Sequence, residues 1–296
     1  MSIGYMGYAK LDTQLVLTTG ANVGEVWEPI YSGSVRGAGW FHAGTSHYAD
    51  DRIRYEGNID FDLQPGLKTF IAAWIYTART TAKQIIISPD GMKIHTYAAA
   101  YNSSANFSTS AGSFITCSLG VLALDRTETA GAASYIANST GQDPTSTNPL
   151  NPSNNNQDPI PYWKSVVTLT GNSVIDGAAM DWNFDVSQNP VVVYACTGSQ
   201  GALAVLMGEM DATASVVLYK DGGIGPVPAG ANASNSSFVV VITVPAGTIT
   251  LKLPAVVFEK DDYDVKDANS ITSRAFTMKG MAGKNVSGIQ PAFMMT

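Results

Sequence analysis

IRYEGNIDFDLQPGLKTFIAAWI, residues 53–75, decides the fold because its hydrophobic pattern changes period in the middle. From Tyr55 to Leu63, apolar or small residues occupy every second position and polar residues fill the positions between. Side chains alternate across a strand, so this part predicts a strand with one apolar and one polar face. Pro65-Gly66 ends the strand, since proline has no N–H to donate. Residues 67–75 then place apolar side chains three and four apart, which predicts an amphipathic helix covering an apolar sheet face.

A second stretch, residues 180–187, repeats the strand pattern in a weaker form. Trp182-Asn183-Phe184-Asp185-Val186 matches Ile59-Asp60-Phe61-Asp62-Leu63 in its alternation, and a Gln and Pro turn follows each. Two similar units in one chain would indicate a duplicated β domain. The match is short, so chance similarity is the alternative.

Composition limits both the fold class and the function. The chain has 296 residues, enough for two domains of ordinary size, with only 14% charged residues and 28 glycines. This composition favours β-sandwiches or barrels rich in turns over a helical bundle. The net charge is −7 and the pI is about 4.9. An acidic surface repels phosphate, which argues against tight nucleic-acid binding but is compatible with brief contact with DNA.

The predicted fold is mainly β, with two tandem β-sandwich or barrel domains, each flanked by a helix or a long loop. The first domain spans 1–126 and the second spans 162–296. The segment 127–161 between them is rich in Asn, Pro, Ser and Thr, so we expect a linker or an ordered arm. The sequence shows neither a signal peptide nor an apolar run long enough for a membrane span.

Catalytic and metal-binding patterns are missing from the sequence. There is no nucleophile elbow and no phosphate-binding loop, and His42 and His47 match no metal-ligand spacing. The acidic run 259–267 lacks the glycine and terminal glutamate of an EF-hand, so a solvated loop over 261–269 is favoured over a calcium site. Cys117 and Cys196 lie in apolar runs and are expected to be buried free thiols. We therefore expect no cofactor, no metal and no enzymatic activity.

Carboxylates and aromatic residues supply the remaining candidate sites. The carboxylates lie on the polar side of the two predicted strands: Glu56, Asp60, Asp62, Asp181 and Asp185. Paired carboxylates are also the catalytic groups of glycosidases, but simple exposure explains them more readily, and they would form an electrostatic lining if that face bordered a channel. The long loop 33–51 and the apolar C-terminus suit contacts between subunits through Trp40, Phe41, Tyr48, Phe293 and Met294. The C-terminus is alternatively expected to dock on its own fold.

Several segments together resemble a known family. They are the strand–helix unit at 53–75, FITCSLGVLAL at 114–124, VTLTGNSVIDGAAMDWNFDVSQNP at 167–190 and ITSRAFTMKGMAG at 271–283. These segments are similar to the major tail tube protein of long-tailed bacteriophages, of the flexible, non-contractile type with two fused tube domains. The resemblance extends over most of 14–126 and 164–283, and it rests on strand patterns without a catalytic motif.

The resemblance implies a structural virion protein that assembles with itself into stacked rings. Single-domain members form hexamers, so a chain with two fused domains would form a trimeric ring of pseudo-sixfold symmetry. The stacked rings would form a tail tube that conducts double-stranded DNA during ejection. Other expected partners are the tape measure, tail tip and tail terminator proteins, with assembly in the host cytoplasm and no membrane contact. The acidic strand faces would line the lumen.

Two other readings of the sequence stay open. The chain could be a different virion β-sandwich protein, such as a capsid decoration protein, a tail terminator or a receptor- or glycan-binding module using Trp40, Phe41 and Tyr48. It could also be a glycosidase using its paired carboxylates, although the usual constellation is missing. Rings or tubes would favour the tail tube, retention on a ligand would favour the binding module, and a cleft with convergent titratable groups would favour the enzyme.

Overall fold

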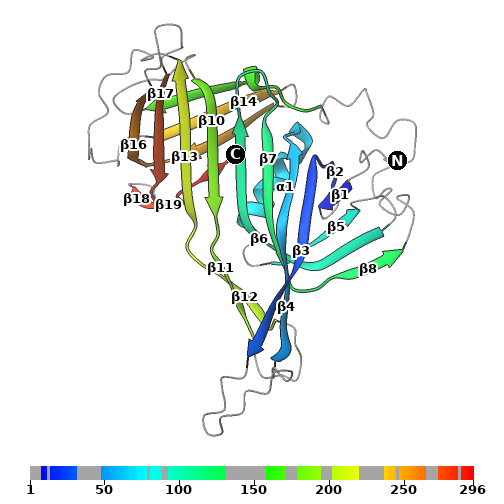
Figure 1. Ribbon diagram of the computed structural model, residues 1–296. Coiled ribbons are helices and arrows are strands. Elements are labelled where there is room, and N and C mark those ends of the chain that lie inside the picture. Colours follow the sequence, from blue (N-terminus) through cyan, green and yellow to red (C-terminus); the bar gives the residue numbers. More distant parts are fainter. Residues whose placement is uncertain are drawn as a thin grey trace.

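The computed structural model describes residues 8–11, 14–31, 48–78, 81–88, 93–130, 158–170, 179–194, 202–219, 237–244, 247–264, 273–285 and 288–296. This part of the chain is built mainly of strands in large antiparallel sheets, as the sequence predicts, together with one α-helix (Figure 1). Within the described ranges no sheet closes on itself, so the barrel alternative is not seen in the single chain.

The first half of the chain contributes eight strands and the helix. They are β1 (Tyr8–Leu11), β2 (Gln14–Leu17), β3 (Gly20–Tyr31), β4 (Tyr48–Asp62), α1 (Lys68–Tyr76), β5 (Lys83–Ser88), β6 (Lys93–Thr109), β7 (Thr116–Ala123) and β8 (Thr127–Ala130). A 3-10 turn, η1 (Pro65–Leu67), joins β4 to α1.

The second half begins with a 3-10 turn, η3 (Tyr162–Lys164). Its strands are β9 (Ser165–Thr170), β10 (Ala179–Ser187), β11 (Pro190–Val193), β12 (Ala204–Met207), β13 (Asp211–Tyr219), β14 (Ser237–Val244), β15 (Gly247–Leu253), β16 (Val256–Asp264), β17 (Ser273–Gly280), β18 (Gly283–Asn285), β19 (Gly288–Gln290) and β20 (Met294–Met295).

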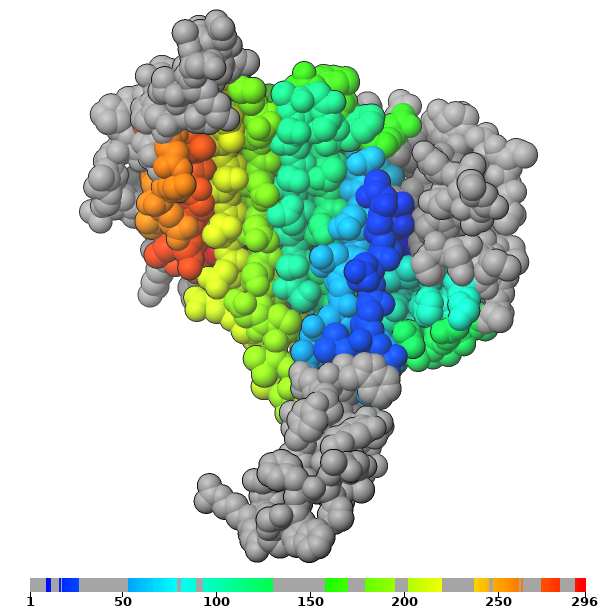
Figure 2. All heavy atoms as spheres, viewed as in Figure 1, coloured from blue at the N-terminus to red at the C-terminus, as the bar shows by residue number. Residues whose placement is uncertain are grey.

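One antiparallel run of strands passes through both halves, and we call it the main sheet. Its order is β3-β4-β7-β6-β10-β13-β17-β16. The strands lie side by side across Figure 1, and their uncovered face is turned toward the viewer in Figure 2. Pairing of β6 with β10 is the junction between the halves, and its register matches Phe107 with Phe184.

The predicted strand and helix at residues 53–75 are confirmed. Ile59, Phe61 and Leu63 are fully buried, while Glu56 and Asn58 point to the exposed face of β4. After the turn at Pro65, α1 buries Phe70, Ile71, Trp74 and Ile75 in the same core. Gly57 is required where β3 crosses β4, since a Cβ there would come within 1.6 Å of the Asn22 carbonyl oxygen.

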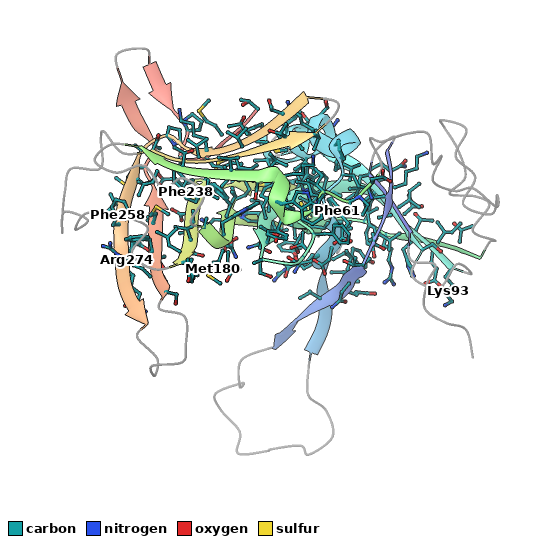
Figure 3. The ribbon with its side chains drawn as sticks, turned by 90° about the horizontal axis from the view of Figure 1, so that it is seen from above. Phe61, Lys93, Met180, Phe238, Phe258 and Arg274 are labelled. Carbon is teal, nitrogen blue, oxygen red and sulfur yellow. The ribbon has the colours of Figure 1, made fainter. Side chains whose placement is uncertain are left out.

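Different outer layers cover the apolar face of the main sheet in the two halves (Figure 3). In the first half the cover is α1 together with β5, β1 and β2, which pair in sequence beyond the first part of β6. In the second half it is a separate sheet in the order β20-β15-β14-β9. Phe238 of β14 is fully buried, and its ring lies 5.1 Å from that of Phe184.

The C-terminal segment docks on its own chain at the junction between the halves. Phe293 is fully buried, with its ring centroid 6.2 Å from that of Phe107 and 5.8 Å from that of Phe184. The Tyr76 hydroxyl donates to the Phe293 carbonyl at 3.2 Å and accepts from the Met295 N–H at 2.8 Å. Helix α1 of the first half is thereby bonded to the last strand of the second.

Three segments differ from the sequence prediction. Gly20–Tyr31 was not predicted as a strand, because Gly20, Gly24 and Pro29 break its apolar pattern, yet it forms β3. The predicted acidic loop 261–269 begins as strand, because β16 continues to Asp264 in pairing with β17. The predicted loop 33–51 ends as strand too, since β4 starts at Tyr48.

The predicted boundaries at 126 and 162 stay predictions. Both described ends of the 127–161 segment lie on the first half: β8 pairs with β6, and the Ile160 N–H donates to the Leu63 carbonyl at 3.0 Å. Residues 131–157 lie outside the described ranges.

Candidate functional site

The polar face of the main sheet is the largest candidate site. Residues opposite one another in an antiparallel pair share a face, so the strand registers trace rows across the sheet. One row joins Asp60, Ser118, Asn106, Asp185, Thr213 and Lys279 from β4 to β17. The next row joins Asp62, Thr116, Ser108, Asn183, Ser215, Thr277 and Lys260. The polar side chains of the two halves thus form one surface.

The predicted carboxylates share this face. Among the residues of this face whose side chains the structure describes, the acidic ones are Glu56, Asp60, Asp62, Asp181, Asp185, Asp211 and Asp262, and the basic ones are Arg54, Lys260 and Lys279. Ion pairs couple Arg54 to Glu56 at 2.5 Å, Lys279 to Asp211 at 3.5 Å, and Lys260 to Asp262. The other four carboxylates keep the face acidic. These four are the pairs Asp60/Asp62 and Asp181/Asp185, which the sequence pattern placed on the polar sides of two strands.

Short polar contacts fix the side chains of this face. Ser118 donates to the Asp60 carboxylate at 2.5 Å, and the Asn106 amide donates to Asn183 across the junction at 3.2 Å. The Asp181 carboxylate accepts from the Ala111 N–H at 3.2 Å, which ties β10 to the turn after β6. These contacts favour an ordered wall with small polar groups over a set of long mobile side chains.

Asp62 of this face has a raised pKa. Partial burial beside the sheet disfavours its charged form and raises the pKa of the Asp62 carboxyl. The side chain is half-buried although it lies on the polar face. The main sheet is therefore enclosed enough near β4 to withdraw water from a carboxylate.

The residues predicted for contacts between subunits fall into two groups. Trp40 and Phe41 lie outside the described residues, and only the backbone of Tyr48 is described, at the start of β4. Phe293 is fully buried within its own chain, so the structure favours the alternative in which the C-terminus docks on its own fold. Met294 is half-buried in β20.

The hairpin of β11 and β12 presents apolar side chains that the sequence did not single out. It extends β10 and β13 beyond the lower end of the main sheet in Figure 1. Val191, Leu203 and Leu206 are each more than half exposed on it. The exposure of Val191 follows from the position of the hairpin beyond the end of the sheet. At the opposite end, Phe114 and Trp163 are exposed beside the turn after β6.

Two hollows on the described surface have no catalytic constellation in their linings. One of about 450 Å³ lies at the upper end of the polar face, lined by Ser108, Thr116, Asp181, Asn183 and Ser215 among others. Another of about 200 Å³ lies between η3 and β10, beside Trp163 and Trp182. Neither hollow gathers titratable groups, because Asp181 is the sole ionisable residue in the lining of the first and Tyr162 is the sole one in the lining of the second.

Among the described residues, no cluster of three or more His, Cys, Asp or Glu side chains is placed to hold a metal ion. None of the helices in the described ranges is long and apolar enough to cross a membrane. Cys117 is a buried free thiol as predicted, and burial raises its pKa well above the usual value. Cys196 lies outside the described residues.

Comparison with protein-family models and with curated proteins finds no match. Among solved structures, the chain is similar to a chain from the virion of a native gene transfer agent particle. The identity is 12% and the TM-score is 0.27, over 46% of this chain and 97% of that one.

Proposed function

We propose that this chain is a structural virion protein of the tail-tube type, whose main sheet forms the inner wall of a hollow tube. The observation that carries the proposal is the continuity of the polar face through both halves. A sheet with one face packed on a core and one face toward water suits a wall between protein and an aqueous channel. Because the polar face extends across the whole main sheet, each copy would contribute a broad segment of that wall.

The chemistry of the face suits passage of DNA without retention. Asp60, Asp62, Asp181 and Asp185 repel phosphate, and the cations Arg54, Lys260 and Lys279 each pair with a carboxylate. DNA affinity depends on neutralising phosphates with Lys and Arg, so a wall of this composition does not hold the duplex. Small hydroxyl and amide side chains fill the rows between the charges.

The halves support a ring of repeated units. In the first half the hairpin β3–β4 is followed along the sheet by β7 and then β6; in the second, β10 and β13 are followed by β17 and then β16. Each half thus supplies four strands in the same order and direction. Three copies would supply six such units, the arrangement expected from the resemblance to fused tail tube proteins. Long hairpins leave the same end of both units in Figure 1, where they would meet a neighbouring ring in the proposed tube.

Electron microscopy of the purified protein, with mass photometry alongside, tests the proposal. We expect rings or hollow tubes built from trimers. Hexameric rings would keep the tube function but overturn the count of two units per chain. A chain that stays monomeric over a range of concentration and salt, and that is also not recruited by a tail-tip complex, would overturn the proposed function.

A further inference from the structure

We propose that β16 of one copy pairs antiparallel with β3 of the next copy, reproducing between chains the β6–β10 junction found within each chain. This inference rests on the proposed self-assembly and names the surface through which it occurs. The partner is a second copy of this chain, and the junction inside the chain is the template.

The template follows from the order of strands. The first half forms a four-strand unit with β3 at one edge and β6 at the other, and the second half forms one with β10 at one edge and β16 at the other. β3 and β10 are therefore equivalent, as are β6 and β16. Within the chain, the edge strand β6 of the first unit pairs with the edge strand β10 of the second through the run from Ser104 to Thr109. The equivalent pair, β16 with β3, consists of the two strands left at the ends of the main sheet.

Strand direction fits the same operation. β6 and β16 run upward in Figure 1, whereas β10 and β3 run downward, so both junctions are antiparallel with the polar faces on the same side. A contact between two different surfaces of identical copies is heterologous, and it generates a closed ring when the rotation is right. Twofold pairing of β3 with β3 would also keep the polar faces on one side, but an isologous contact closes as a dimer and leaves β16 unused.

Apolar side chains at the two free edges are only partly buried, which indicates that each edge can accept another strand. At the junction, Phe107, Phe184 and Val186 are fully buried. On the equivalent core-facing positions of the free edges, Val23 of β3 and Phe258 of β16 are only partly buried, although both pack against the core. A strand added at each edge would cover these side chains as β10 covers those of β6.

The backbone of β3 has a hydrogen-bonding side turned away from β4. The Val23 carbonyl accepts from the Tyr97 hydroxyl at 3.1 Å. In an antiparallel ladder the N–H and C=O of one residue point to the same side, so the Val23 N–H also faces the edge. The Val23 carbonyl has a second lone pair for a bond from a neighbouring strand.

Cross-linking between single-cysteine copies tests the pairing directly. One copy carries Asn22→Cys and the other Lys260→Cys, both in a Cys196→Ser background; both positions are exposed on the polar face, and native Cys117 is buried. A short bis-maleimide should join the two variants into a mixed dimer. The matched control pairs Asn22→Cys with Asp185→Cys, an exposed position on β10 at the centre of the sheet, and should give at least tenfold less dimer.

Proline at position 23 tests the same edge without a cross-linker. Val23→Pro removes an N–H that does not serve the β3–β4 ladder, and Val23→Thr is the matched control that keeps it. We expect Val23→Pro to keep the circular dichroism of the parent but to lose the cross-link and the rings, while Val23→Thr keeps both. If Val23→Pro fails to fold, the cysteine pair decides alone.

Failure of this inference is distinguishable from failure of the proposed function. Rings or tubes that form without the 22–260 cross-link would overturn the edge pairing and leave the tube intact. A cross-link in a protein that forms open filaments would support the edge pairing and overturn the tube. Cross-linking of Asn22→Cys copies with one another in place of the mixed dimer would overturn the proposed pairing in favour of a twofold contact.

Discussion

The junction between the halves and the free edges of the main sheet are the same kind of structure in two states. At the junction, β6 and β10 are paired, and Phe107, Phe184 and Phe293 form a ring cluster behind them. At the free edges, the equivalent strands β16 and β3 lack a described neighbour on one side, and Phe258 and Val23 are only partly buried. The difference teaches what an added copy supplies: backbone partners and cover for apolar side chains that the fold already places in position.

Removing one aromatic ring from the junction and one from a free edge should give the largest difference in unfolding free energy. Phe184→Ala leaves a cavity among Trp182, Phe238 and Phe293 and should lower the free energy of unfolding by about 3–5 kcal/mol. Phe258→Ala, at the free edge, should cost about 1 kcal/mol in the monomer, because its side chain is still partly in water. Urea unfolding of both variants measures the difference. Equal losses would show that the edge is as complete as the junction.

The hydrogen bonds behind the junction should give the next largest effect. Tyr76→Phe removes the hydroxyl that donates to the Phe293 carbonyl and accepts from the Met295 N–H. We expect a loss of about 1–3 kcal/mol in unfolding free energy, since buried backbone groups lose their partner. Tyr101→Phe, at a half-exposed position of β6, is the control and should change little. A neutral Tyr76→Phe would mean that the C-terminus does not hold the halves together.

Charge on the free edge should control association more weakly. Glu259 and Asp262 are exposed on β16, and the chain carries a net charge of −7. Copies therefore repel at low salt, and salt screens this repulsion over a Debye length of about 10 Å at 0.1 M. We expect Glu259→Gln with Asp262→Asn to raise the yield of the 22–260 cross-link several-fold at low salt and to flatten its rise with salt. An unchanged salt profile would argue that these side chains lie away from the contact.

Asp62→Asn should give the smallest effect, and it measures how enclosed the polar face is at the end of β4. The pKa of Asp62 is raised by burial, so the folded state binds more protons than the unfolded state in the window above the usual carboxyl value. The contribution of this group to stability is therefore fully present at acid pH and is lost as the pH rises through its folded pKa. Asp62→Asn should raise the urea midpoint at neutral pH relative to the parent. Near pH 4 the gain should shrink, and a constant gain across pH would contradict the assignment.

The sequence predicted well wherever one strand face meets a core. The alternation from Tyr55 to Leu63 and the stripe of α1 reflect burial within one element, so a local pattern suffices to find them. The carboxylates of β4 and β10 were placed on polar faces for the same reason. Their meeting on one surface was not predictable, because it depends on β7 and β6 lying between them in register.

The missed strand β3 has a physical cause. Among the described residues β3 is an edge strand with Gly20, Gly24 and Pro29, and it packs its apolar side chains only partly, so its pattern is weak.

The duplication suggested by the short match between residues 59–63 and 182–186 stays a prediction. That match joins β4 with β10, whereas the strand order used in the proposed function pairs β10 with β3 as equivalent strands. A strand's position in the sheet is set by pairing between distant segments, which a five-residue match does not report.

Accessibility of the polar face before and after assembly tests the proposed inner wall most directly. Asp185→Cys lies exposed on that face, and Thr243→Cys lies exposed on β14 in the outer layer. A large polyethylene-glycol maleimide should label both positions in the unassembled chain. In rings or tubes it should label Thr243→Cys as before and leave Asp185→Cys unmodified, because the channel excludes it. Equal labelling of both positions in the assembled state, or protection of Thr243→Cys alone, would contradict a channel lined by the main sheet.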